Sequence, residues 1–218
     1  MTSIEHTARL TGPITLHITT QAADVQVVAD PRVTGTIIEL STKDTDGPAV
    51  DAIGRARFRD DGRDVHLTLT EGQGGTVIRG AQVFGNVTVN GMTMVNGVVI
   101  GGGGYVSSGI TVRAITEPGS TVVVETMSGD VITRNVSAVR AKTMSGDIEA
   151  DGVTDDSALK SMSGDIRVTG GTLASGSRDA ARHGTSGPRV TASTMSGDVS
   201  GYSVDLNASS MSGRVWNR

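Results

Sequence analysis

The sequence of 218 residues contains no cysteine, and proline and aromatic residues are scarce. Without cysteine the chain has no disulfide, no thiolate nucleophile and no zinc site built on thiolates. Aromatic residues make up 2% of the chain, so there is little surface on which nucleic-acid bases or sugar rings could stack. Five prolines and no Gly-X-Y period exclude collagen and proline-rich disorder. A core must therefore be built from Val, Ile, Leu, Ala and Met.

The charges of the chain are mixed along its length, and the formal net charge is −4. No basic block is present that would contact a phosphate backbone, so we expect no nucleic-acid partner. No segment approaches the roughly 20 apolar residues that a membrane span needs, so we expect no direct membrane insertion. The first ten residues include Glu5, His6 and Arg9 and lack the apolar core of a signal peptide. These features predict a cytoplasmic protein.

The most informative feature that is present is an internal repeat. The motif Met-Ser-Gly-Asp begins at Met127, Met144, Met162 and Met195, and a fifth copy at Met211 ends in Arg214 instead of aspartate. The steps between copies are 17, 18, 33 and 16 residues. Thr or Ser precedes each copy and Val or Ile follows each aspartate, which indicates a strand on either side of a tight turn.

A period near 17 residues, at about 3.3 Å per strand residue, fits a closed coil of three short sides. Successive coils would stack about 4.8 Å apart, and stacking would bury the apolar face that one coil cannot bury alone. The repeat therefore predicts an all-β protein, a parallel β-helix or β-solenoid. The 33-residue step is best explained by an inserted loop at about residues 175–188, although a degenerate coil would also account for it.

The rest of the chain divides into two further regions. Residues 1–75 contain four alternating segments typical of half-buried strands, at residues 14–19, 24–29, 33–40 and 65–70. Residues 49–58 fit a strand or a short helix. We interpret residues 1–75 as a strand region that caps the solenoid, residues 76–120 as its Gly-rich first coils, and residues 121–218 as the repeat itself.

The repeats resemble those of the bacterial adhesin-like β-strand-repeat family of unknown function, whose members carry serial Ser-Gly-Asp-Val/Ile turns after an N-terminal strand region. The likeness is best over residues 122–215. It implies a right-handed β-solenoid and, because the family has no established catalytic residues, it assigns none here. The Gly-rich middle of the chain is also faintly similar in composition to bactofilins, which are cytoskeletal β-helices.

The aspartates of the repeat are the first candidate site. Stacked turns would align Asp130, Asp147, Asp165 and Asp198 in one column. The simplest role for each carboxylate is to accept hydrogen bonds from backbone N–H groups of its own turn. The functional alternative is a weak site for calcium or another hard cation, although the nine-residue pattern of calcium-binding rolls is missing.

The methionines of the repeat are the second candidate. Strand alternation predicts that Val122, Val124 and Thr126 point inward, and that the charged Glu125, Lys142 and Lys160 point outward. The methionines share the parity of these charges, so alternation places them outside; a bend already at Met would put them in the core instead. The exposed arrangement is an apolar, adaptable interaction surface. Its members are Met127, Met144, Met162, Met195 and Met211. The C-terminal end is a second candidate for such a surface, where either Trp216 folds over the open last coil or the end pairs with another molecule.

No catalytic, cofactor or metal motif is apparent in the sequence. Histidine occurs four times, at His6, His17, His66 and His183, without metal-ligand spacing. We therefore expect a non-catalytic scaffold, without a cofactor, that forms a homo-oligomer or binds a protein partner. The alternatives are an envelope-associated, adhesin-like module that binds a cation or glycan, and a carbohydrate-active enzyme.

Overall fold

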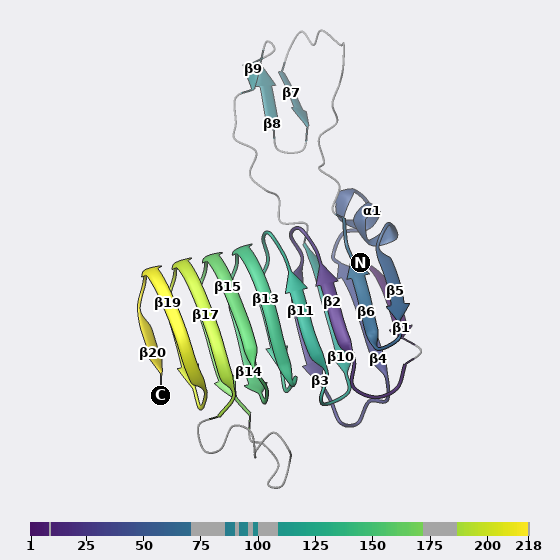
Figure 1. Ribbon diagram of the computed structural model, residues 1–218. Helices are drawn as coiled ribbons and strands as arrows, with labels where there is room; N and C mark the ends of the chain where they lie inside the picture. The colour runs from purple at the N-terminus through teal and green to yellow at the C-terminus, as the bar shows by residue number, and fades with distance from the viewer. Residues whose placement is uncertain are drawn as a thin grey trace.

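Two large β-sheets form most of the protein (Figure 1). The structure is a computed structural model that describes residues 1–8, 10–70, 109–171 and 187–217, and the backbone of three short strands between residues 86 and 99. Both large sheets mix parallel and antiparallel pairs, and neither sheet closes on itself, since each ends in two edge strands. The predicted all-β class is confirmed.

The first sheet has nine strands. In spatial order they are β1 (Thr2–Ala8), β4 (Thr36–Thr42), β10 (Ile110–Thr116), β3 (Asp24–Ala29), β12 (Val131–Arg134), β14 (Ile148–Val153), β16 (Ile166–Gly170), β18 (Val199–Tyr202) and β20 (Val215–Asn217). From β10 to β20 all neighbours are parallel, whereas β4 runs antiparallel to both β1 and β10.

The second sheet has eight strands. In spatial order they are β19 (Asp205–Ser212), β17 (Arg189–Ser196), β15 (Ser157–Ser163), β13 (Ala138–Ser145), β11 (Thr121–Glu125), β2 (Thr15–Thr19), β6 (Asp64–Thr68) and β5 (Arg57–Asp61). A separate antiparallel sheet contains β7 (Asn86–Val89), β8 (Met92–Val95) and β9 (Val98–Val99).

Each copy of the repeat contributes one strand to each large sheet. The strand before the turn joins the eight-stranded sheet and the strand after it joins the nine-stranded sheet, as in β11 and β12 or β13 and β14. The coil of three sides that the 17-residue period predicted is therefore wrong, because two strands and their connections take up the period. Equivalent residues of successive repeats pair in register; Val131 is opposite Ile148, and Ile148 is opposite Ile166.

The 33-residue step between the third and fourth turns does not separate their strands. β15 pairs directly with β17 and β16 pairs directly with β18. Of the loop expected at residues 175–188, all but the last two residues lie outside the described part of the chain.

The first 70 residues supply strands to both sheets. All four expected strand segments are present, as β2, β3, β4 and β6. Residues 49–58 contain the end of a helix and the start of a strand, because α1 (Pro48–Gly54) is followed by β5. The helix begins at a proline, which suits the first helical position, and buries Ala49, Ala52 and Ile53. Among the described residues, no helix is long and apolar enough to cross a membrane.

A single aliphatic core fills the space between the two sheets. Alternation along the strands produces it, as predicted: Val122, Val124 and Thr126 are buried, while Glu125 is exposed. The buried side chains are Val, Ile, Leu and Ala, supplemented by Thr and Ser, and no aromatic side chain among the described residues is fully buried.

Candidate functional site

The Met-Ser-Gly-Asp turns stack into one continuous edge of the molecule, where the two sheets are joined. From the second turn onward, the carbonyl oxygen of the turn serine accepts a hydrogen bond from the glycine N–H of the preceding turn, as Ser145 does from Gly129 at 3.1 Å. The residue after each aspartate donates to the next aspartate's carbonyl oxygen; Ile148 N to Asp165 O is 2.9 Å. The turns are therefore hydrogen-bonded to one another like the strands that they connect.

The turn glycine is required by both conformation and space. Gly129, Gly146, Gly164 and Gly197 have φ values of 143° to 149°, which L side chains rarely adopt. A Cβ at Gly146 would overlap the carbonyl oxygen of Gly129, and the same overlap recurs at each later turn. Close stacking of the turns therefore depends on the missing side chain.

The turn aspartates form a hydrogen-bonded ladder. Oδ1 of Asp130 accepts from the N–H of Asp147 at 2.9 Å, and Oδ1 of Asp147 accepts from the N–H of Asp165 at 2.8 Å. Asp198 N–H then donates to Asp165 Oδ1, and Arg214 N–H donates to Asp198 Oδ1, both at 2.8 Å. Each carboxylate thus bonds the following turn, whereas the sequence analysis expected it to bond its own.

The ladder begins with a residue that the sequence analysis missed. Oδ1 of Asp24, at the start of β3, accepts from Asp130 N–H at 3.2 Å. Gly129 packs on the carbonyl oxygen of Ala23 as later glycines pack on their predecessors. Residues 20–24 read Thr-Gln-Ala-Ala-Asp, so only the hydroxyl residue and the aspartate of the repeat, followed by Val25, were available as a signal.

No metal site accompanies the ladder in the described part of the chain. Its carboxylates are spread along the stack with one per turn, and no three His, Asp or Glu side chains in the described ranges are grouped to hold an ion. The carboxylate oxygens instead align neighbouring turns.

A column of hydroxyl groups lies on the core side of the turns. Ser161, Thr194 and Ser210 each donate to the glycine carbonyl of the preceding turn, at 3.3, 3.2 and 2.8 Å respectively. The Oγ1 of Thr143, which is buried at the same position, has no hydrogen-bond partner among the described residues. The residue before Met is thus a small hydroxyl residue that fits under the turn and usually caps it.

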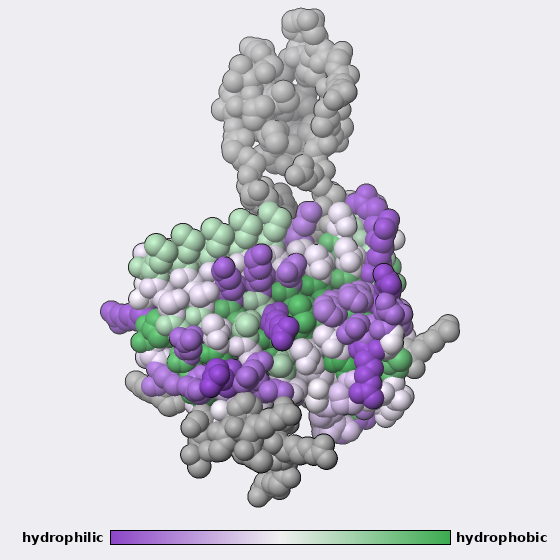
Figure 2. Space-filling view, in the orientation of Figure 1, coloured by the Kyte–Doolittle hydropathy of each residue, from purple (hydrophilic) through white to green (hydrophobic). Residues whose placement is uncertain are grey.

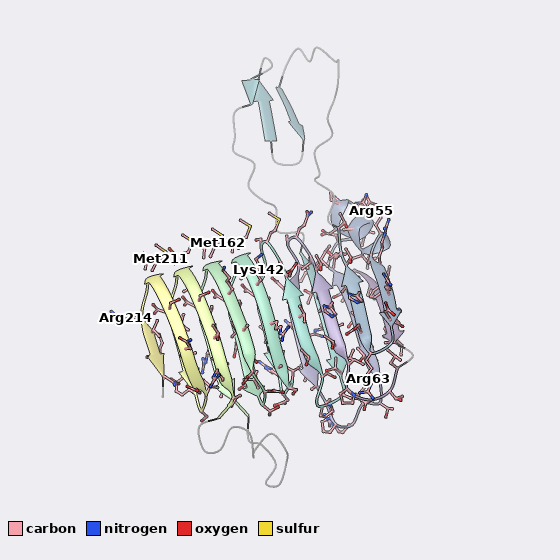
Figure 3. The ribbon with its side chains drawn as sticks, in the orientation of Figure 1. Arg55, Arg63, Lys142, Met162, Met211 and Arg214 are labelled. Atoms are coloured by element: carbon pink, nitrogen blue, oxygen red, sulfur yellow. The ribbon has the colours of Figure 1, made fainter. Side chains whose placement is uncertain are left out.

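The methionines form a row along the outside of this edge, which we call the methionine stripe (Met127, Met144, Met162, Met195 and Met211). The exposed fraction is 43–47% for the first four and 78% for Met211. Figure 2 shows the stripe as a pale green row along the upper edge, and Met162 and Met211 point away from the ribbon in Figure 3. The structure therefore places the methionines outside, as strand alternation predicts, and the buried arrangement is wrong.

The C-terminal end of the stack exposes two further apolar side chains. β19 and β20 are the last strands of their sheets, and their residues are more exposed than the equivalents in earlier repeats. Val215 is 45% exposed and Trp216, which lies in β20 opposite Ser200, is 36% exposed. Trp216 thus extends the outer surface of a sheet.

Two histidines that are far apart in sequence meet on the outer face of the eight-stranded sheet. The rings of His17 in β2 and His66 in β6 stack with centroids 4.4 Å apart, and Nε2 of His17 is 3.8 Å from Asp64. This pair could not be predicted from the sequence, because it is the parallel pairing of β2 with β6 that brings the two positions together.

One shallow depression of about 360 Å³ lies beside the loop after β3. The charged residues that line it are Asp30 and Arg32, and Oδ2 of Asp30 is 2.8 Å from Nη2 of Arg32. Hydrogen bonds from Arg32 lower the pKa of Asp30 to about 2, so this carboxyl is ionised at neutral pH and is unsuited to donate a proton.

Known proteins resemble this chain in fold but not in sequence. No protein-family model and no curated protein match the sequence. The crystal structure of a "putative cell adhesion protein" from Clostridium sporogenes matches with a TM-score of 0.54 and 6% identity, over 99% of this chain and 97% of that one. A "putative adhesin" from Bacteroides fragilis matches with a TM-score of 0.40 and 9% identity, over 100% of this chain and 97% of that one. The first likeness supports the expected adhesin-like fold, and it concerns the fold alone.

Proposed function

We propose that this protein is a non-catalytic, right-handed β-solenoid scaffold that self-associates through the methionine stripe. The observation that carries the proposal is the row of five exposed methionines, one per turn, on a rigid edge. The methionines lie outside the core, and their long thioether side chains can adapt to a facing surface.

A second copy of the chain is the partner that fits the stripe best. The methionines recur with the spacing of neighbouring strands, about 4.8 Å. Another copy presents the same side chains at the same spacing, so two stripes related by a two-fold axis can interdigitate along their length.

Sedimentation velocity over a range of concentrations tests this function. We expect the wild-type sedimentation coefficient to rise with concentration, and the triple variant Met127→Ser, Met144→Ser, Met162→Ser to remain monomeric. The matched triple Leu variant keeps the apolar surface and should associate like wild type. Because the replaced side chains are exposed, all three proteins should melt at similar temperatures. A wild type that stays monomeric at the highest concentration, or a Ser variant that associates equally, would refute the proposal.

A second candidate function is an adhesin-like module that binds a partner at the cell envelope. The fold shared with the Clostridium sporogenes protein over nearly the whole of both chains favours it. The two functions predict different locations: the scaffold is expected in the cytoplasm and the adhesin at the cell periphery. A fluorescent fusion observed in a bacterial cell distinguishes them.

A further inference from the structure

We propose that Met162, Met195 and Met211 form a binding site for a soft monovalent cation, Cu(I) or its redox-inert analogue Ag(I). The thioether sulfur is a neutral, polarizable ligand that prefers such ions to hard cations like calcium. This proposal concerns the sulfur atoms, and so goes beyond the apolar surface on which self-association depends.

The strand register aligns the three thioethers. Thr194 is opposite Ser210 and Ser196 is opposite Ser212, which places Met195 opposite Met211. In the same way, Lys160 pairs with Ser193 and Ser163 with Ser196, which places Met162 opposite Met195. Neighbouring parallel strands are about 4.8 Å apart, so one ion between two such side chains can contact both sulfur atoms. Met195, with a methionine on either side, is the central ligand.

The exposure of these side chains suits an ion that enters from solvent. Met162 and Met195 are 43% and 47% exposed, so about half of each side chain packs against its surroundings while the rest is accessible. The partial packing limits the conformations that the thioethers must give up on binding. In Figure 3, Met162 and Met211 extend from the same edge of the ribbon.

The charges beside the stripe favour its C-terminal pair of methionines. Glu125 is beside Met127, but every other pair of neighbouring methionines has a lysine beside at least one member. Residues two apart in a strand point to the same side, which places Lys142 beside Met144 and Lys160 beside Met162. The corresponding neighbours of Met195 and Met211 are the uncharged Ser193 and Ser209. A bound cation is repelled by an ammonium group only a few ångströms away, so the ion should sit toward Met195 and Met211.

The other charged groups of these turns have opposing signs. Asp165 and Asp198 follow their methionines by three residues and make the edge negative, which attracts a cation. Arg214 takes the aspartate position in the last turn, and Lys160 stands at the rim of the site next to Met162. Among Met162, Met195 and Met211, these charges leave Met195 with the least local repulsion.

Silver titration followed by methyl NMR tests the site on the full-length chain. The protein is labelled with ¹³C at the methionine methyl groups, single Leu variants assign the signals, and silver nitrate is added in chloride-free buffer. We expect the signals of Met162, Met195 and Met211 to shift at the lowest silver concentrations, while that of Met1 does not. The absence of cysteine removes the strongest competing ligand.

Two Leu variants provide the control. The triple variant Met162→Leu, Met195→Leu, Met211→Leu should bind silver at least about ten-fold more weakly, whereas Met127→Leu, Met144→Leu should bind like wild type. Equal binding by the triple variant would assign the silver to other groups, such as the histidines, and would overturn the proposal; so would methyl signals that all shift together with that of Met1. Leucine preserves the apolar surface of the stripe but removes the sulfur atoms. Loss of silver binding in the Leu variants therefore tests the cation site alone, and loss of association in the Ser variants tests self-association.

Discussion

At the scale of single residues, the repeat is defined by what each position of the turn must do. The hydroxyl residue fits below the turn, Met extends outward, Gly permits close stacking and Asp bonds the next turn. The hydroxyl, glycine and aspartate positions all contact the neighbouring turn directly, whereas Met extends to solvent. They are therefore the positions at which substitution should affect stacking.

Substitution of Gly146 by alanine should destabilise the protein strongly. Gly146 has a φ of 145°, and a residue with a Cβ in this conformation lowers the free energy of unfolding by about 1–3 kcal/mol. The overlap of the Cβ with the Gly129 carbonyl oxygen lowers it further. Gly12→Ala is the control, because Gly12 also has a positive φ, of 95°, but no atom lies within 4 Å of the added Cβ. Thermal unfolding should show a larger loss for Gly146→Ala. Equal losses would mean that close stacking of the turns contributes nothing.

The aspartate ladder should depend on the acceptor oxygen and not on the charge. Asp147→Ala removes the acceptor for Asp165 N–H and should cost about 0.5–1.5 kcal/mol. Asp147→Asn keeps Oδ1 and removes one of several like charges, so at low salt it should be as stable as wild type or more stable. Denaturant unfolding at low salt measures both. An Asn variant as unstable as the Ala variant would contradict this role.

Much of this residue-level description could be predicted from sequence. The inward positions and the exposure of Met127, Met144 and Met162 follow from alternation alone. The start of the ladder at Asp24 could not be predicted, because Gln21, Ala22 and Ala23 replace the other residues of the motif. Its role depends on the pairing of β3 with β12, which joins segments about 100 residues apart and leaves no periodic signal.

At the scale of secondary-structure elements, one carboxylate ties together three connections. Oε1 of Glu117, between β10 and β11, accepts hydrogen bonds from the N–H of Gly12 at 2.7 Å and of Gly35 at 2.6 Å. Gly12 lies between β1 and β2, and Gly35 lies between β3 and β4. Glu117 therefore fixes the N-terminal strands against the strand that leads into the repeat.

These bonds make stability depend on pH in a defined direction. The backbone N–H groups, first of Gly12 and then of Gly35, lower the pKa of Glu117. The stabilisation is complete above the ordinary glutamate pKa of about 4.3, and is lost as pH falls through the lower pKa of the folded state. Between about pH 5 and pH 3, wild type should therefore lose more stability than Glu117→Gln. Parallel pH curves in urea unfolding would show that Glu117 contributes nothing.

Element prediction succeeded where alternation is regular and failed where tertiary pairing decides. β2, β3, β4 and β6 were expected because apolar and polar residues alternate in them. β1 was missed, since most of its residues are exposed or half-buried and it is held by antiparallel pairing with β4. The segment around α1 and β5 was ambiguous because it contains both elements in ten residues.

At the scale of the whole molecule, the repeat period predicted that successive repeats stack, but it did not determine how many strands each repeat contains. Seventeen residues can make three short strands or two longer ones with their connections, and β13 alone uses eight residues. The assignment of residues 1–75, 76–120 and 121–218 to separate regions stays a prediction, although strands of the first and last regions lie side by side in both sheets. The function was less predictable still, because the exposed methionines show a surface and not its partner.

The in-register alignment of the methionine stripe underlies both the contact surface and the soft-cation site. Because the chain lacks cysteine, it can be tested with engineered pairs. Neighbouring positions such as Met144 and Met162 should have Cα atoms about 4.8 Å apart, within the range that a disulfide spans, whereas Met127 and Met162, two steps apart, should exceed it. Mild oxidation followed by thiol counting should show an intramolecular disulfide in Met144→Cys, Met162→Cys and free thiols in Met127→Cys, Met162→Cys. Free thiols in the first pair, or a rapid disulfide in the second, would contradict the in-register alignment of the methionine stripe.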